Sequence, residues 1–542
     1  MKVKLFTLLL LLFVVFNIGL GSFGLSETSE ARYAEISKEM VISGDYLHPT
    51  LLGIKHYHKP PLTYYISSLG YAIFGINEFG ARFFLGIALL LQIYLVFRIG
   101  YLLLKDEKIA YASAVIYSSF PIVLIAVRNL TTDAFLVTFI LWSIYLWLKY
   151  QKSKKPMDLY GFFTVLGLAF LTKGPVGLIP SLLFIVCYKF YYKEKIKFSL
   201  PVLFGAILTL AISGSWFLAI ILDDPKVWDY FIQEQIINRA TNADQFHRSQ
   251  PIWYYLLLAP VLGLPWVIFI ITYLLKKIKL EWKQSLLLKI ILSTSVLLFI
   301  LFSLFSSKLI LYILPIFPFI ALLGGMLLYK FSKKQLGYFI KCYYALFIIL
   351  ILALIFSFFY AEIEVNYLQT SFIIFLAIAC LLYFLKVSKQ NTTSKLLQLS
   401  VGFIVCLLLV HTTFASSNPN IINSFKSISK FIQQEKGGTI SDVIVYDDLL
   451  PSAKFYLNSS IITVHDNNYK TIREIQFEHN TTYKKNIINL KDPSGLSRFK
   501  HLFQGRDHVY IERKKSPLND SLSYLLETFT HKVEKGKWVI YY

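Results

Sequence analysis

The chain has 542 residues, of which 56% are hydrophobic and only 16% charged, and its 54 lysines and arginines against 32 acids give a net charge of +22. An ordinary soluble protein carries roughly a quarter of its residues as charged side chains, so this composition excludes that class. Apolar runs of about 20 residues recur, and a helix of that length crosses the ~30 Å core of a bilayer. The sequence therefore predicts an all-α polytopic membrane protein.

Thirteen candidate membrane-spanning segments follow one another along the chain. They cover residues 5–24, 80–104, 109–127, 131–150, 158–172, 175–192, 198–222, 252–276, 286–305, 308–330, 338–360, 367–386 and 395–415. The first is also compatible with a secretory signal peptide, but its apolar run continues through Gly21 without a cleavage signal. Residues 61–75 are apolar but short, which favours an interfacial or re-entrant helix. Pro315 and Pro318 predict a kink in the tenth segment.

The loops on the two sides of these segments differ in charge. One set of alternating loops holds nearly half of all lysines and arginines with few acids, whereas the opposite set is net acidic. Lysine and arginine accumulate in cytoplasmic loops, so we expect a cytoplasmic N-terminus and an outer C-terminus. A nucleic-acid-binding protein would instead gather its positive charge on one soluble surface. The charge thus sets topology and excludes nucleic acid as a partner.

Three outer pieces are long enough to carry chemistry, namely loops 25–79 and 223–251 and the tail 416–542. The tail alternates strand-like stretches with helical ones, which predicts a small α/β domain. The stretches are 443–446, 460–464, 508–512 and 537–542 for strands and 422–435, 451–457 and 520–530 for helices. We therefore expect a transmembrane catalytic domain, residues 1–415, and an outer domain, residues 416–542. The cytoplasmic loops are too short for a nucleotide-binding domain, so chemistry belongs on the outer face and needs a lipid-carried substrate.

The first outer loop predicts an amphipathic helix at the membrane interface. Tyr33, Ile36 and Met40 recur at helical spacing, and Gly44 follows as a stop signal. The same stretch carries charged residues, which form either a solvated face or part of a binding site. These residues are Arg32, Glu35 and Glu39.

Basic side chains occur in four separate outer loops. Lys59 precedes two prolines and an apolar segment, which places it at the depth of the lipid headgroups. Its ammonium there either contacts a lipid phosphate or simply extends to water. Lys173, Arg248 and Lys308 lie in three further loops. Asp133 opens the fourth segment, and a carboxylate at membrane depth marks either a functional site or a helix N-terminus stabilised by the helix dipole. This arrangement predicts a site for an anion with a lipid tail.

In chain order, these residues lie in a set of short motifs: EARYAEISKEM with SGDYLHP, YHKPPLTYY with FGINEFGAR, TTDAFL, LTKGPVGLIP, HRSQPIWYY with GLPW, and SKLILYILPIFP. Together they resemble the bacterial PMT/aminoarabinose-transferase-like glycosyltransferases of the GT-C class, which use polyprenyl-phosphate sugars. Each motif is weak alone, but six in this order make a specific match. The motifs of the resemblance lie in residues 1–330. The rest of the chain resembles the family only in its arrangement of membrane spans and an outer C-terminal domain. It implies a GT-C fold with about 13 transmembrane helices in the bacterial inner membrane, with a periplasmic C-terminal domain.

The resemblance also implies roles for individual residues. Lys59 matches the lysine that contacts the donor phosphate, and Arg248, Tyr312 and Lys308 are expected in the same pocket. The family's first loop often places a catalytic Asp where this chain has Ser29, so either Glu30 or Glu27 takes that role or Asp133 does more of the work. The remaining residues that we expect to line the substrate pocket are Arg32, Tyr33, Glu35, Lys173 and His247.

The implied reaction needs no cofactor, although a divalent metal is possible. His58 stands where relatives commonly have a glutamate, which puts a metal held there in doubt, but His58 with His247 could bind one. The reaction is transfer of a sugar from an undecaprenyl-phosphate-linked donor to a lipid A-like lipid or an envelope glycan. The alternatives are a protein O-mannosyltransferase of the same fold and a polytopic lipid or sugar transporter.

Overall fold

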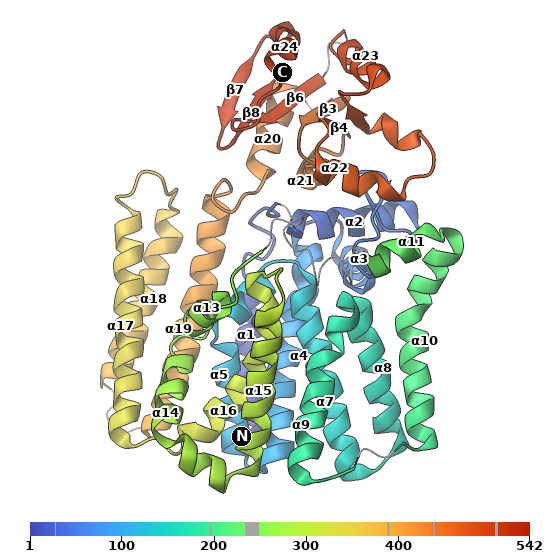
Figure 1. Ribbon diagram of the computed structural model, residues 1–542. Coiled ribbons are helices and arrows are strands. Elements are labelled where there is room, and N and C mark those ends of the chain that lie inside the picture. The colour runs from blue at the N-terminus through green and yellow to red at the C-terminus, as the bar shows by residue number, and fades with distance from the viewer. Residues whose placement is uncertain (28, 196–197, 234–248, 387–390, 438–439, 505–507) are drawn as a thin grey trace. The chain divides into compact units, whose positions relative to one another are not determined.

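The computed structural model describes residues 1–27, 29–195, 198–233, 249–386, 391–437, 440–504 and 508–542 (Figure 1). Contacts divide the chain into two compact units. The first unit comprises Met1–Leu20, Lys59–Thr63 and Arg82–Phe414, and the second comprises Gly21–His58, Tyr64–Ala81 and Ala415–Tyr542. The second unit thus contains the first outer loop, except for residues 59–63, in addition to the C-terminal tail.

The first unit is built of apolar helices. In chain order they are α1 (Lys2–Asn17), α4 (Glu78–Leu104), α5 (Glu107–Ser118), α6 (Pro121–Arg128), α7 (Thr132–Ser153), α8 (Pro156–Lys173), α9 (Ile179–Tyr192), α10 (Leu200–Asp223), α11 (Lys226–Asp229), α13 (Tyr254–Leu262), α14 (Trp266–Gln284), α15 (Leu286–Leu304), α16 (Phe317–Leu328), α17 (Lys333–Ser357), α18 (Tyr367–Lys386) and α19 (Thr392–Ser417), with 3₁₀ helices η1 (Gly174–Gly177) and η4 (Ile310–Ile316).

Nine helices of the described residues are long and apolar enough to cross a membrane, and eleven spans result if the bent pairs α5–α6 and α13–α14 each count as one. All thirteen expected segments contain helix, and the two that are not among these eleven spans contain α1 with 16 residues and α9 with 14. The all-α membrane fold is confirmed, and the exact number of spans stays a prediction.

Paired polar groups hold the helices of the first unit together. Gln92 of α4 donates to the Ala134 carbonyl of α7 at 2.7 Å and accepts from the Tyr117 hydroxyl of α5 at 2.7 Å. Such pairing is required because a polar group left unpaired in an apolar bundle costs several kcal/mol.

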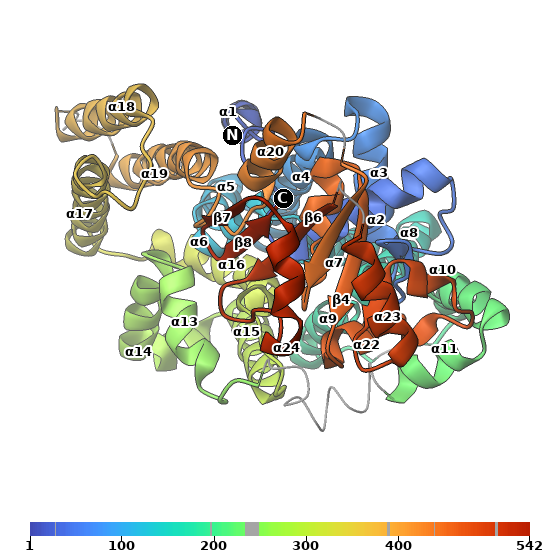
Figure 2. The same cartoon turned by 90° about the horizontal axis from the view of Figure 1, so that it is seen from above.

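The helices α17, α18 and α19 lie side by side in both views (Figures 1 and 2). The Tyr344 hydroxyl of α17 donates to the Phe384 carbonyl of α18 at 3.1 Å.

The expected irregularity around the two prolines is present. Residues 310–316 form the 3₁₀ helix η4, which contains Pro315, and α16 begins at Phe317 with Pro318 in its first turn. Proline interrupts the backbone hydrogen bonds of an α-helix, whereas it fits the first turn of the next one. The break leaves Tyr312 in a short helix before α16.

The second unit combines helices with a six-stranded sheet. Its helices are α2 (Ser29–Ser43), α3 (Leu62–Phe74), α20 (Lys426–Glu435), α21 (Pro451–Leu457), α22 (Tyr469–Glu474), α23 (Pro493–Leu502) and α24 (Asp520–Ser523), with 3₁₀ turns η5 (Ile475–Phe477), η6 (Thr482–Lys485) and η7 (Tyr524–Thr528). Its strands are the paired β1 (Thr50–Leu51) and β2 (Ile54–Lys55), and β3 (Asp442–Tyr446), β4 (Ser460–His465), β5 (Ile487–Asn489), β6 (His508–Arg513), β7 (Lys532–Lys535) and β8 (Trp538–Tyr541) of the sheet.

The sheet has the order β5-β4-β3-β6-β8-β7, with β3, β4, β5 and β6 parallel and β8 antiparallel to both β6 and β7. The small α/β domain predicted from the tail is therefore confirmed, and each strand and helix expected there is present. The strands β5 and β7 were not predicted. The first is only three residues long, and the second, Lys-Val-Glu-Lys, has three charged residues and no buried one.

The two faces of the sheet carry separate cores. Because side chains alternate along a strand, Val443 and Val445 join one core and Ile444 joins the other. Ile36 and Met40 of α2 lie in the first core. The amphipathic helix is therefore confirmed, including its stop at Gly44, whose N–H donates to the Met40 carbonyl at 2.9 Å and whose φ is 72°. Ile36 and Met40 thus face the sheet domain, and the expected place of the helix at the membrane interface stays a prediction.

Candidate active site

A carboxylate and an ammonium meet at one end of the hairpin that α7 and α8 form. The two helices lie next to each other in Figure 1. Asp133 lies in the first turn of α7, and Lys173 is the last residue of α8. The two helices are joined by two residues and run antiparallel, which brings these ends together. Lys173 Nζ lies 2.5 Å from Asp133 Oδ1 and 4.1 Å from the centre of the Tyr312 ring. The fold thus brings together three of the predicted site residues.

This group is buried although it is charged. The Asp133 residue is only 6% exposed, and the side chain of Lys173 is 10% exposed. A lysine over an aromatic face gains an attraction of about 0.5–2 kcal/mol. The arrangement supplies an ammonium for an anionic substrate group, together with a carboxylate that can accept a proton.

Lys308 occupies a second position in the first unit. Its ammonium donates to the Gln250 carbonyl at 2.7 Å, and Ser249 and Ser307 form an isolated β-bridge beside it. The contact ties the segment before α13 to the segment before η4. Its expected role at the donor phosphate stays a prediction, as does that of Arg248. Arg248 and His247 lie outside the described residues.

Lys59 lies half-buried between β2 and α3 and belongs by contacts to the first unit, as do Asp133, Lys173 and Tyr312. Pro60 and Pro61 follow it directly, and α3 begins at Leu62. Two consecutive prolines restrict the backbone just after the lysine. The lysine is thus presented on a stiff segment, and its contact with a phosphate stays a prediction.

The two glutamates proposed as catalytic lie in the second unit and bind main-chain amides. Glu27 Oε1 accepts from the Ser452 N–H at 2.8 Å, and burial raises the pKa of Glu27 to about 7. Glu30 Oε2 accepts from both the N–H of Ser26 at 2.9 Å and its hydroxyl at 3.1 Å. These contacts stabilise the start of α2 and its connection to α21. A catalytic role for either residue stays a prediction.

The expected pocket residues of α2 are also engaged within the second unit. Arg32 Nη1 lies 3.7 Å from Glu474 Oε1, and the rings of Tyr33 and Tyr64 are 5.4 Å apart. Glu35 is completely buried, so the alternative of a solvated face is wrong for this residue.

The surroundings of Glu35 explain its burial. Its Oε2 lies 3.6 Å from Lys38 Nζ, which donates to the carbonyls of Lys454 and Phe455 in α21 at 3.1 and 3.3 Å. Burial raises the pKa of Glu35 to about 8 and lowers that of Lys38. The charged side of α2 therefore packs on the sheet domain in place of water.

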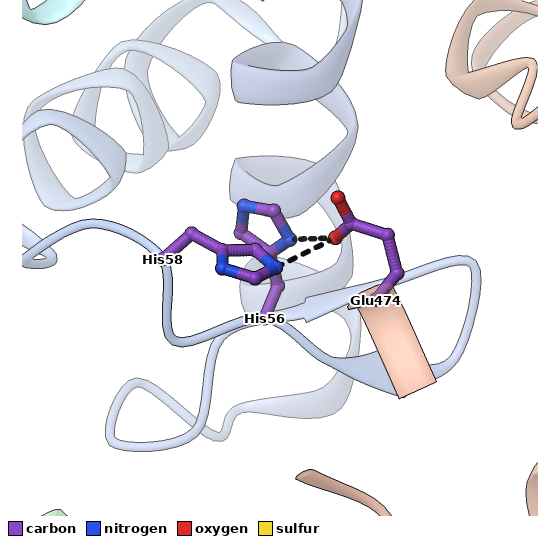
Figure 3. A group of neighbouring side chains, drawn as sticks. All are labelled: His56, His58 and Glu474. Carbon is purple, nitrogen blue, oxygen red and sulfur yellow. Dashed lines mark hydrogen bonds and ion pairs between the residues drawn. The ribbon is translucent and has the colours of Figure 1, made fainter. Parts of the chain in front are cut away.

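The described residues include one cluster of possible metal ligands, of which the sequence had indicated His58 but neither His56 nor Glu474. His56, His58 and Glu474 converge in the second unit (Figure 3). Burial lowers the pKa of His56 and lowers that of His58 to about 3. Burial opposes ionisation of Glu474, but nearby His58, Arg32 and His56 hold its pKa well below the usual value. The His-x-His spacing was the available signal, since alternate residues of an extended segment share a side.

Comparisons with known proteins show what part of the chain is similar to. Residues 58–217 match the family described as dolichyl-phosphate-mannose-protein mannosyltransferase. The chain is 29% identical over 349 residues to undecaprenyl phosphate-alpha-4-amino-4-deoxy-L-arabinose arabinosyl transferase 1 of Pseudomonas fluorescens (strain Pf0-1), covering 61% of this chain and 59% of that protein. It is 32% identical over 301 residues to the protein of the same name from Proteus mirabilis (strain HI4320), covering 54% and 53%. The chain spans less than two thirds of the length of these curated relatives.

The solved structures cover nearly the whole chain. The crystal structure of ArnT from Cupriavidus metallidurans in the apo state matches with a TM-score of 0.76 and 21% identity over 100% of this chain and 98% of that one. The chain has the ArnT fold. The crystal structure of the same ArnT bound to undecaprenyl phosphate matches with a TM-score of 0.75 and 19% identity over 99% and 97%. The expected resemblance to the PMT/aminoarabinose-transferase-like proteins is confirmed, and the family match includes Lys59, Asp133 and Lys173.

Proposed function

We propose that this chain is an integral-membrane glycosyltransferase that moves a sugar from an undecaprenyl-phosphate-linked donor to a lipid A-like lipid or an envelope glycan. The observation that carries the proposal is the buried Asp133–Lys173 pair beside Tyr312, at the end of a helix hairpin that lies within the family match. The ArnT fold supports it, as do the names of the curated relatives and the undecaprenyl phosphate bound in one ArnT structure.

The chemistry divides between cations and a carboxylate. An acceptor hydroxyl oxygen attacks the anomeric carbon, the bond from that carbon to the phosphate oxygen breaks, and the electron pair leaves with the lipid phosphate. Lys59, with Arg248 and Lys308, stabilises the charge of this leaving group, which is most effective where water is excluded. Asp133 takes the hydroxyl proton, a contribution of typically ~10²–10⁴-fold in rate. The anomeric configuration inverts.

If the acceptor is instead an anionic phosphate, no base is needed. The carboxylate of Asp133 then orients the sugar through its hydroxyl groups. Loss of this carboxylate should therefore slow transfer to a hydroxyl acceptor more than transfer to a phosphate acceptor. The same cations stabilise the leaving group in both reactions. No cofactor takes part in either route.

We place the reaction on the periplasmic side of a bacterial inner membrane, with the N-terminus in the cytoplasm and the C-terminal domain outside. The support is the concentration of lysine in one set of loops. The substrate is then a lipid that has already crossed the membrane, and bilayer lipids surround the helices of the first unit.

A second candidate is a protein O-mannosyltransferase, which is favoured by the description of the family that residues 58–217 match. Labelled sugar on a polypeptide, with none on lipid or glycan, would select it. A transporter would move substrate across liposomes without forming a new glycosidic bond.

Replacement of Lys59 tests the proposal most directly. In proteoliposomes supplied with an undecaprenyl-phosphate-linked sugar and membrane glycolipid acceptors, Lys59→Ala should abolish transfer while the protein inserts and folds normally. Lys59→Arg keeps the charge and should retain part of the activity. Lys55→Ala removes a lysine of the same loop, whose main-chain N–H binds Glu478, and should transfer normally. Near-normal transfer by Lys59→Ala would refute the assignment of this residue to the donor phosphate.

A further inference from the structure

We propose that His56, His58 and Glu474 form a binding site for a divalent transition-metal ion, with zinc as the best fit. The site lies within the second unit and uses none of the residues assigned to sugar transfer. The inference therefore goes beyond the proposed function and does not depend on it.

The three side chains present their donor atoms to one point (Figure 3). His56 Nδ1 lies 2.9 Å and His58 Nε2 lies 3.1 Å from the same oxygen, Glu474 Oε2. All three donor atoms lie within 4.8 Å of one another. Zinc bonds of about 2.0–2.1 Å in a tetrahedron separate neighbouring ligand atoms by roughly 3.3 Å, so small side-chain movements would admit an ion.

The type of donor also fits zinc. Two imidazole nitrogens and one carboxylate oxygen form a set that protein zinc sites use, with a fourth position left for water or another ligand. Imidazole and carboxylate ligands suit zinc and its neighbours in the first transition row better than they suit calcium or magnesium, which prefer oxygen ligands throughout.

The surroundings keep the three ligands dry and fix Glu474. The residues are 2%, 7% and 2% exposed in the order His56, His58 and Glu474. Arg32 and Arg473 approach the other carboxylate oxygen, Oε1, at 3.7 and 3.1 Å. These guanidinium groups orient the carboxylate so that Oε2 faces the imidazoles, which is the role of supporting residues around a metal ligand. The positive charge of these two arginines repels a metal ion. The affinity for the ion must therefore come from the three ligands, whose donor atoms already lie close together.

The backbone that carries the histidines is held in place on both sides. The His56 N–H donates to the Pro49 carbonyl at 2.7 Å, and the Lys55 N–H donates to Glu478 Oε1 at 2.7 Å. The ring of Tyr57 packs against Phe477 with 5.2 Å between ring centres. Glu474 is the last residue of α22, so an ion here would link the first outer loop to the C-terminal domain. It would also fix the residue that directly precedes Lys59.

The test uses the purified full chain in detergent, exposed to zinc chloride and freed of unbound metal by gel filtration. Elemental analysis should find one zinc ion per chain. Glu474→Gln, His56→Ala and His58→Ala should each weaken zinc binding at least tenfold. The matched control is His48→Ala, because His48 lies in the same loop but contacts Asp45 at 2.8 Å. This variant should bind zinc as the wild type does.

The proposal would be refuted if the wild type bound no zinc, or if the wild type and the three ligand variants bound equal amounts. The three residues would then be a hydrogen-bonded cluster of two imidazoles and a carboxylate. If a ligand variant fails to fold, cobalt binding to the wild-type chain still tests the site. Cobalt bound by these ligands gives visible absorption bands of a four-coordinate nitrogen and oxygen site, and a six-coordinate aquo spectrum would refute the proposal. Metal binding is measured without sugar donor, so its outcome is independent of transfer activity.

Discussion

The three acidic side chains proposed as catalytic have different partners in the two units. In the first unit, Asp133 pairs with the ammonium of Lys173 at the end of a helix hairpin. In the second unit, Glu27 and Glu30 accept hydrogen bonds from main-chain N–H groups. An acid bound to the main chain stabilises the fold whether or not a substrate is present, whereas an acid paired with one flexible lysine can exchange that partner for a substrate. The difference separates acids suited to chemistry from acids that hold a loop.

The largest effect is expected for Asp133. Asp133→Asn removes the charge and the proton acceptor with little change in shape. We expect transfer to a hydroxyl acceptor to fall by about 10²–10⁴-fold, because the acceptor then loses its base. Initial rates of transfer in proteoliposomes, compared at equal amounts of inserted protein, measure this.

The hairpin itself supplies the matched control. At its other end, Asp158 is 2.7 Å from Lys149, whose side chain is 47% exposed. Asp158→Asn should keep transfer within a fewfold of the wild type, because this carboxylate lies at the opposite end of the hairpin from Asp133 and Lys173. Equal losses in the two variants would contradict the distinction between the two ends.

A smaller, pH-dependent effect is expected for Glu27. Its pKa is raised from 4.5 to about 7, so the folded state holds a proton that the unfolded state releases in this range. Stability therefore decreases as pH rises from about 4.5 to about 7, by roughly 3 kcal/mol from this group. Glu27→Gln keeps an oxygen for the Ser452 N–H and removes the ionisation. Unfolding midpoints of the full chain in detergent should accordingly depend less on pH in this variant.

The control for Glu27 is an exposed acid of the same unit. Glu534→Gln removes a carboxylate that contacts Lys514 at the surface, and it should retain the pH dependence of the wild type through the same range. A Glu27→Gln variant with an unchanged pH profile would show that Glu27 is ionised in the folded protein.

The smallest effect is expected for Glu30. Glu30→Gln preserves an acceptor for the Ser26 N–H, so we expect transfer close to that of the wild type. Glu30→Ala removes the acceptor and should lower the free energy of unfolding by about 1–2 kcal/mol. Transfer rates and unfolding of both variants are compared. Loss of transfer in a stably folded Glu30→Gln would make Glu30 the base and would contradict the role given to Asp133.

Much of the architecture follows from local sequence. Apolar runs of the right length become helices, as in α4 and α15, because burial of the backbone in an apolar surrounding requires internal hydrogen bonding. Gly44 ends α2 because it adopts a positive φ without a steric penalty. The strands of the tail were visible because β-branched and aromatic residues cluster in them. Asp133 and Lys173 were recognised as charges at the ends of apolar segments.

The sequence by itself determined the helices of the first unit, the α/β character of the tail and the short motifs that relate the chain to a family. Only the tertiary structure decided that the apolar face of α2 joins the core of the sheet domain and that Tyr312 lies against Lys173. It also decided that Glu474 meets two histidines more than 400 residues earlier in the chain. The physical reason is that periodicity and turn signals depend on neighbours along the chain, whereas the partner of a buried charge depends on which distant surfaces pack together.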